Sequence, residues 1–65
     1  MVNKFILTGK SDRWGPWENK RLHMKIKYWE GNETGGYDVY KNGKKLNKIW
    51  ISSYSKALKF ARKYI

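Results

Sequence analysis

The sequence predicts an α+β domain, in which an antiparallel sheet of three to four strands carries one C-terminal helix packed on one face. Three observations support this fold class. Apolar and basic residues alternate over 21–29, as in a strand with one buried face. Asn42-Gly43 lies between β-prone runs and indicates a hairpin, because both residue types tolerate positive φ. Apolar residues at helical spacing follow Ser53.

The length and composition are those of a single small domain, 1–65. A chain of 65 residues buries only about 60% of its unfolded surface, so the core must be small. Aromatic residues make up 17% of the chain and supply large buried areas. The absence of cysteine excludes a disulfide frame and a zinc knuckle. The apolar run at 5–7 is too short for a signal peptide or a membrane span, so we expect a cytoplasmic protein.

Net charge is the strongest global feature of the sequence. Fifteen Lys and Arg residues against five Asp and Glu residues give +10. This charge predicts a polyanionic partner, with nucleic acid first, an acidic protein second and anionic lipid third. The alternative is a charged surface that only confers solubility. Twelve Lys against three Arg, with frequent Asn, Ile and Tyr, indicate A/T-rich codons, as in a low-G+C bacterium, its phage or a mobile element.

The N-terminal part predicts one strand and one loop. Residues 4–8 are β-prone and end at a turn signal. Residues 11–20 form a loop, because Gly15-Pro16 interrupts regular structure. Trp14 and Trp17 either cover an open edge of the core or offer a stacking surface to a ligand.

The clearest strand is 21–29, which has one apolar and one basic face. Residues 31–36 contain three glycines and form the turn that follows. Four of the five acids lie in loops, which leaves the strands almost purely basic. The apolar face of the strand consists of Leu22, Met24, Ile26 and Tyr28, and its other face of His23, Lys25, Lys27 and Trp29.

The hairpin joins strands 37–40 and 44–52, and two registers are compatible with it. A two-residue turn at Asn42-Gly43 pairs Val39 with Leu46. A three-residue loop with the glycine as a left-handed bulge pairs Tyr40 with Lys44 instead. We favour the second register, because it buries more β-branched surface. Its buried face carries Tyr37, Val39, Ile49 and Ile51, and its exposed face carries Tyr40, Lys48 and Trp50.

Ser53 is expected to cap the C-terminal helix. The helix has an apolar side and a basic side, so it must lie on the sheet and show its charge to solvent. The apolar side consists of Tyr54, Ala57, Leu58, Ala61, Tyr64 and Ile65, and the basic side of Lys56, Lys59, Arg62 and Lys63.

The exposed face of the sheet is the candidate binding surface, because basic residues interleaved with aromatics suit contact with phosphates and bases. The alternative is a register off by one, with Trp50 and Tyr40 in the core. The candidate nucleic-acid-binding residues are Arg21, His23, Lys25, Lys27, Trp29, Tyr40, Lys48 and Trp50.

No constellation for catalysis or metal binding is found in the sequence. His23 is the only histidine, and there is no carboxylate pair, no nucleophile with a base and no Gly-rich phosphate loop before a helix. We therefore expect a protein that is not an enzyme and has no cofactor and no metal.

From about Leu22 to Tyr64, the predicted order of elements resembles the three-stranded-sheet-plus-helix DNA-binding domains of integrase arm-binding regions and of plant ethylene-response factors. The resemblance implies that the exposed sheet face enters the major groove, with Lys25, Lys27, Tyr40, Lys48 and Trp50 as contacts. The chain departs from the pattern in its few arginines, its extra N-terminal strand and the absence of an integrase catalytic domain. The matching positions are Trp14-Gly15, Trp17, the Asn42-Gly43 hairpin, Ser53, Ala57 and Ala61.

The expected function is non-enzymatic binding of nucleic acid, DNA rather than RNA and double-stranded, with no membrane partner. The alternative is a small phage-type effector that binds and inhibits an acidic host protein. A nucleic-acid binder would depend on dispersed lysines. An effector would depend on a compact aromatic hot spot such as Trp14, Trp17 or Trp50.

Overall fold

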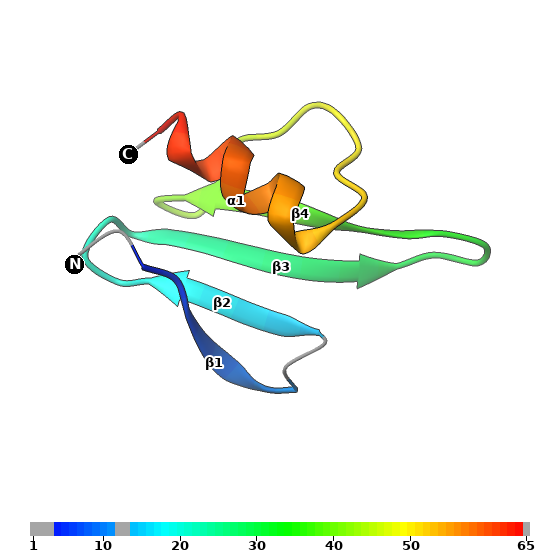
Figure 1. Ribbon diagram of the computed structural model, residues 1–65, viewed down its shortest axis with the longest axis horizontal. Coiled ribbons are helices and arrows are strands. Elements are labelled where there is room, and N and C mark those ends of the chain that lie inside the picture. Colours follow the sequence, from blue (N-terminus) through cyan, green and yellow to red (C-terminus); the bar gives the residue numbers. More distant parts are fainter. Residues whose placement is uncertain (1–3, 12–13, 65) are drawn as a thin grey trace.

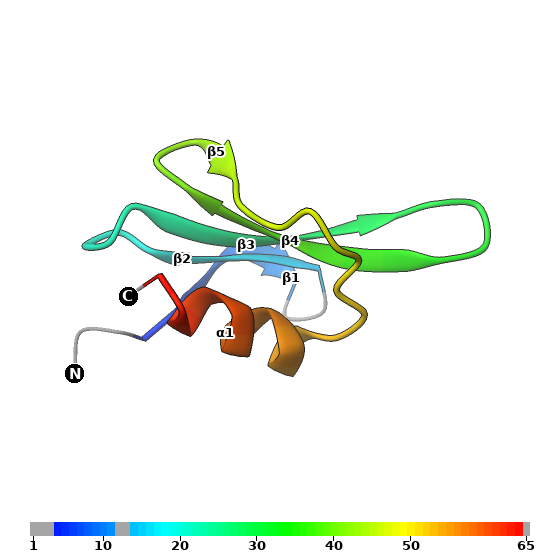
Figure 2. The same cartoon turned by 90° about the horizontal axis from the view of Figure 1, so that it is seen from above.

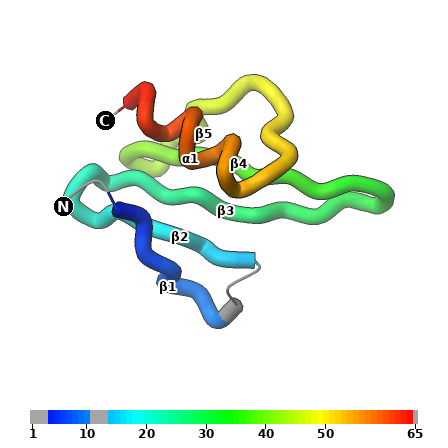
Figure 3. The backbone as a smooth tube through the Cα atoms, in the orientation of Figure 1, coloured from blue at the N-terminus to red at the C-terminus, as the bar shows by residue number. Residues whose placement is uncertain are grey.

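The computed structural model describes residues 4–11 and 14–64, which form one antiparallel five-stranded sheet and one helix (Figure 1). The strand order follows the chain, so β1 and β5 lie at opposite edges (Figure 3). The α+β class and the C-terminal helix are confirmed, but the sheet has five strands rather than three to four. The elements are β1 Ile6–Ser11, β2 Gly15–Asn19, β3 Met24–Glu30, β4 Gly35–Lys41, β5 Lys44–Lys45 and α1 Tyr54–Arg62.

The prediction of a loop over 11–20 was wrong, because this region contains β2. The Gly15-Pro16 peptide bond is cis. Pro16 precedes the first residue paired with β3, which is Trp17 opposite Ile26. The missing N–H of the proline therefore interrupts no hydrogen bond on that side of the strand. A proline is tolerated in a sheet at such a position.

β3 begins at Met24 rather than at residue 21, because the residues before it form a turn. His23 has a left-handed φ of 57°, which ends the strand pattern. The turn is fixed by the buried side chain of Asn19, whose Oδ1 accepts a hydrogen bond from the Leu22 N–H at 3.1 Å. Leu22 packs against the core from this turn. Its apolar side chain continued the alternating pattern of the strand, and the strand was therefore predicted to be longer than it is. At the other end, Gly35 and Gly36 lie in β4 and not in the predicted turn.

The favoured three-residue loop in the hairpin was also wrong. Asn42-Gly43 forms a two-residue turn with φ values of 53° and 81°, and Lys41 lies opposite Lys44. The Leu46 N–H donates to the Val39 carbonyl at 2.7 Å, as the shorter turn requires. Turns with positive φ at both central residues match the twist of the strands, and this geometry outweighs the number of β-branched residues buried.

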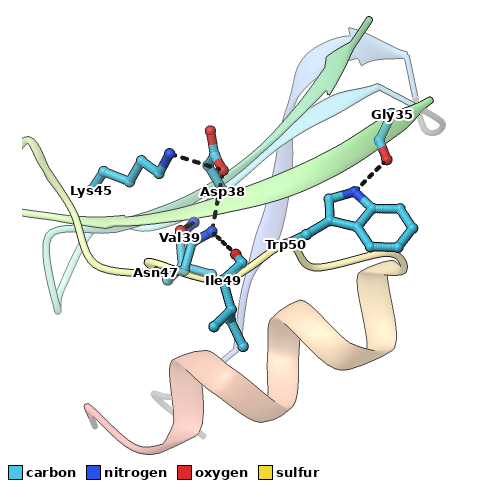
Figure 4. A network of polar contacts seen from close by, with 7 residues as sticks. All are labelled: Gly35, Asp38, Val39, Lys45, Asn47, Ile49 and Trp50. Atoms are coloured by element: carbon cyan, nitrogen blue, oxygen red, sulfur yellow. Dashed lines mark hydrogen bonds and ion pairs between the residues drawn. The ribbon is translucent and has the colours of Figure 1, made fainter. Parts of the chain in front are cut away.

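Residues 46–52 leave the sheet instead of continuing β5. The buried side chain of Asn47 accepts a hydrogen bond from the Val39 N–H at 2.9 Å and donates to the Ile49 carbonyl at 3.0 Å (Figure 4). The Asn47 side chain thus pairs with the Val39 N–H, which would otherwise pair with a longer β5. Because this segment is not an extended strand, residues two apart do not lie on the same face. Ile51 is buried, whereas Ile49 is 65% exposed, so the prediction of one buried face for both was wrong.

Helix α1 lies across one face of the sheet (Figure 2), with Ala57 and Ala61 fully buried beneath it. The predicted cap is confirmed, because the Ser53 Oγ accepts a hydrogen bond from the Lys56 N–H at 3.3 Å. Phe60 also packs against the core, although its position was not on the predicted apolar side. Ile65 lies outside the described residues. The buried apolar core consists of Trp17, Met24, Ile26, Val39, Ile51, Ala57 and Ala61.

The two N-terminal tryptophans lie on the helix side of the sheet. Trp17 belongs to the core, and its ring centroid is 4.4 Å from that of Tyr54. Desolvation by burial raises the pKa of the Tyr54 phenol above its ordinary value of 10.0. Trp14 is 40% exposed and packs edge-on against Tyr28, with ring centroids 4.7 Å apart. The interpretation of these tryptophans as cover for a small core therefore holds for Trp17.

Candidate nucleic-acid interface

The sheet face opposite α1, here called the open face, is covered by no helix of the described chain (Figure 2). Its residues follow from the register, since directly opposed residues point to the same side. Lys25 lies opposite Glu18 on β2 and opposite Tyr40 on β4. Tyr40 in turn lies opposite Lys45 on β5. One row of three charged side chains and one tyrosine thus crosses four strands.

Both carboxylates of the open face are engaged within the protein. The Glu18 carboxylate accepts a hydrogen bond from the Thr8 hydroxyl at 2.7 Å. The Asp38 carboxylate accepts one from the Asn47 amide at 3.2 Å, and the Lys45 Nζ is 3.9 Å from it. The Asp38 side chain is 18% exposed, against 53% for that of Lys45. The acids are thus held against neighbouring groups, while the lysine side chains project outward.

Seven of the eight predicted contact residues line two hollows of this face. The first hollow lies toward the Asn42-Gly43 turn, and the second lies beside the 48–50 segment. The first collects His23, Lys25, Lys27 and Tyr40, and the second Trp29, Lys48 and Trp50.

The eighth residue, Arg21, lines neither of these two hollows, but its own hollow shares Glu18 and Lys20 with the first. It lies in the turn before β3, and its hollow also contains residues of β1. His23 was predicted to lie on a strand, but it reaches the first hollow from the same turn as Arg21. Two lysines that were not predicted also contribute, Lys20 in the first hollow and Lys45 in the second. The correct hairpin register would have revealed Lys45, since it places this residue opposite Tyr40.

The Trp29 and Trp50 rings both lie close to Gly36. A Cβ built on Gly36 would lie 2.8 Å from the Trp50 Nε1 and 2.9 Å from the Trp29 Cζ2. Only glycine leaves room for both rings at this point of β4. The Trp50 indole N–H donates to the Gly35 carbonyl at 2.9 Å, which fixes the ring (Figure 4). Trp50 is nevertheless 61% exposed, so the alternative that placed it in the core does not hold.

Two further observations concern residues 4–11 and 14–64. No helix there is long and apolar enough to cross a membrane. No group of three or more His, Asp and Glu side chains in this part of the chain is placed to hold a metal ion.

Comparisons of the chain with protein-family models, with curated proteins and with solved structures find no match. The resemblance to sheet-plus-helix DNA-binding domains therefore stays a prediction. The case for a function rests on the open face itself.

Proposed function

We propose that the protein binds nucleic acid, and duplex DNA in particular, through the open face. The observation that carries this proposal is an uncovered sheet face on which Lys25 and Lys27 lie beside Tyr40 and the Trp29–Trp50 pair. Lysines attract phosphates whatever the base sequence, and aromatic side chains contact bases and sugars. The combination favours a nucleic acid over an acidic protein at this face.

The dimensions of the open face suit a duplex. Lys25 and Lys27 are two residues apart on β3, about 7 Å, so each can contact a different phosphate. The major groove is about 12 Å wide and admits a two-stranded β-ribbon. β3 and β4 form such a ribbon, which extends beyond β2 (Figure 1). Glu30 and Glu33 near its exposed turn would repel phosphates, so the turn itself is expected to stay away from the DNA backbone. Lys25 lies where β2 and β5 flank the ribbon, and it would contact a phosphate at the rim of the groove.

The test compares two double variants that each remove two positive charges. Lys25→Ala/Lys27→Ala acts on the open face, and Lys56→Ala/Lys59→Ala acts on exposed positions of α1. Fluorescence anisotropy measures the affinity for two duplexes of unrelated sequence at several salt concentrations. We expect the open-face variant to bind both duplexes more weakly and to lower the slope of log K against log salt by about 2. The helix variant should change both quantities much less.

Three further measurements complete the test. Trp50→Ala should weaken binding with little change of the salt slope, because an indole releases few counterions. An RNA duplex of the same sequence should bind less well, since its major groove is too narrow for side chains. Equal losses in the two double variants would show that net charge alone drives binding. Duplex affinities weaker than about 10⁻⁴ M at physiological salt would refute the proposal.

A further inference from the structure

Two large apolar side chains are held at the surface beyond the edge of the sheet. Ile49 is 65% exposed and Trp50 is 61% exposed. They do not belong to a loose loop. The Ile49 carbonyl accepts a hydrogen bond from the Asn47 side chain, and the Trp50 indole donates to the Gly35 carbonyl (Figure 4). The next residue, Ile51, accepts a backbone hydrogen bond from Tyr37 at 2.9 Å. The exposure of both side chains is therefore built into the fold.

An apolar groove separates this segment from α1. Ile49 and Trp50 form one wall, and Phe60 contributes from the helix. In Figure 4 the Ile49 side chain points toward the α1 ribbon. Lys56, Lys59 and Lys63 line the helix side of the groove, and the lining contains no acid. The groove thus has an apolar centre and a basic rim.

We propose that this groove docks an acidic protein segment that carries apolar side chains. The apolar centre would receive its aliphatic or aromatic residues, and the three helix lysines would pair with its carboxylates. A buried apolar centre within a charged rim is the usual anatomy of a protein–protein interface. The groove adjoins the open face, because Ile49 and Trp50 also line its second hollow, but the helix side of the groove is separate from it. The proposal therefore does not depend on nucleic-acid binding at the open face.

Charge and shape argue against other occupants of the groove. A second copy of this chain would bring the same three lysines into contact with one another, at a net charge of +10 per copy. Single-stranded nucleic acid needs successive exposed ring faces. The Phe60 ring packs against the Tyr64 ring, with centroids 5.4 Å apart, and the Lys63 Nζ lies 5.7 Å from the Phe60 centroid. Phe60 is therefore engaged within the protein and does not present an open ring face to a base.

The experiment uses two display libraries of 14-residue peptides. In the first library, four positions are Asp or Glu and four are large apolar residues. In the second, Lys and Arg replace the acids. Selection with the full chain should enrich binders from the acidic library only. The affinity of these binders is then measured by anisotropy with four variants of the chain.

Two variants alter the groove and two are matched controls. Ile49→Ser should weaken the peptides about tenfold, whereas Ile6→Ser, at a residue 63% exposed on β1, should not. Lys56→Ala/Lys59→Ala should weaken them about fivefold, whereas Lys25→Ala/Lys27→Ala should not. The two lysine variants are expected to act in the reverse order on DNA, so the two proposals fail separately.

Several outcomes would overturn the groove proposal. One is enrichment from both libraries alike, or from neither. Another is an equal loss of affinity in the groove and control variants, which would indicate attraction by net charge. A third is that the groove variants lose affinity for anionic lipid vesicles or for a single-stranded oligonucleotide while their peptide affinity stays unchanged.

Discussion

Asn47 determines where the chain leaves the sheet. Its side-chain oxygen accepts the Val39 N–H, and its nitrogen donates to Asp38 and to the Ile49 carbonyl. An amide side chain carries both a donor and an acceptor, as a peptide group does, and can therefore replace a strand residue. The buried Val39 N–H is satisfied without a longer β5, which frees the next residues to turn toward α1.

We expect Asn47→Ala to destabilise the protein by about 2–3 kcal/mol, because it leaves a buried donor unsatisfied. Urea unfolding followed by tryptophan fluorescence measures the change. The control is Asn32→Ala in the exposed turn between β3 and β4, which should change the stability by less than about 0.5 kcal/mol. Equal effects of the two substitutions would show that the Asn47 side chain does not close the sheet edge.

At the scale of elements, α1 is held by its cap and by two small residues. Its N-terminus is satisfied by Ser53, and Ala57 and Ala61 bring the helix close to the sheet. These features are local in the sequence: a capping residue, then alanines at i, i+4 spacing on one side. For this reason the helix was predicted correctly.

Ser53→Ala should destabilise the protein by about 1 kcal/mol through loss of the cap. Ala61→Asp should cost several times more, because it places a charge in a fully buried position. Thermal unfolding followed by circular dichroism measures both changes. Lys59→Ala, at an exposed position of α1, is the control and should have little effect, since alanine favours helix. A cap variant as stable as this control would contradict the assigned helix start.

The strands were predicted less well, because their limits depend on contacts that the local pattern does not contain. Leu22 continues the alternation of β3 but packs from a turn that Asn19 fixes. Pro16 looked like a strand breaker, but it precedes the residues that pair with β3. The bulged register was favoured from β-branched burial, whereas the positive φ at both Asn42 and Gly43 selects the two-residue turn.

At the scale of the whole molecule, the distribution of charge predicts how strongly salt weakens DNA binding. Five lysines line the two hollows of the open face. Each phosphate neutralised contributes about −0.9 to the slope of log K against log salt, so the wild-type slope should be about −4 to −5. Titrations between about 50 and 200 mM salt measure it. A slope steeper than about −8 would require the helix lysines as well, and would contradict docking by one face. The five lysines are Lys20, Lys25, Lys27, Lys45 and Lys48.

Most residues of the candidate interface were predicted, but the contacts that position them were not. Strand alternation was sufficient to place Lys25, Lys27 and Trp29 on one side of β3, because an exposed face repeats every second residue. It could not reveal that Trp50 reaches the open face from outside the sheet, held by the Gly35 carbonyl above a side-chain-free Gly36. Such a contact joins residues far apart in the chain and leaves no periodic signal.

The order of the strands has a consequence for folding. Since every strand pairs with the one before it, the sheet can grow by one hairpin at a time, and each pairing closes only a short loop. The exception is α1, which follows the last strand and returns across the sheet to the Trp17 side chain of β2. Chains dominated by such local pairings fold quickly for their size. We therefore expect the docking of α1 to be the step at which the core excludes water and the hairpins become one cooperative unit.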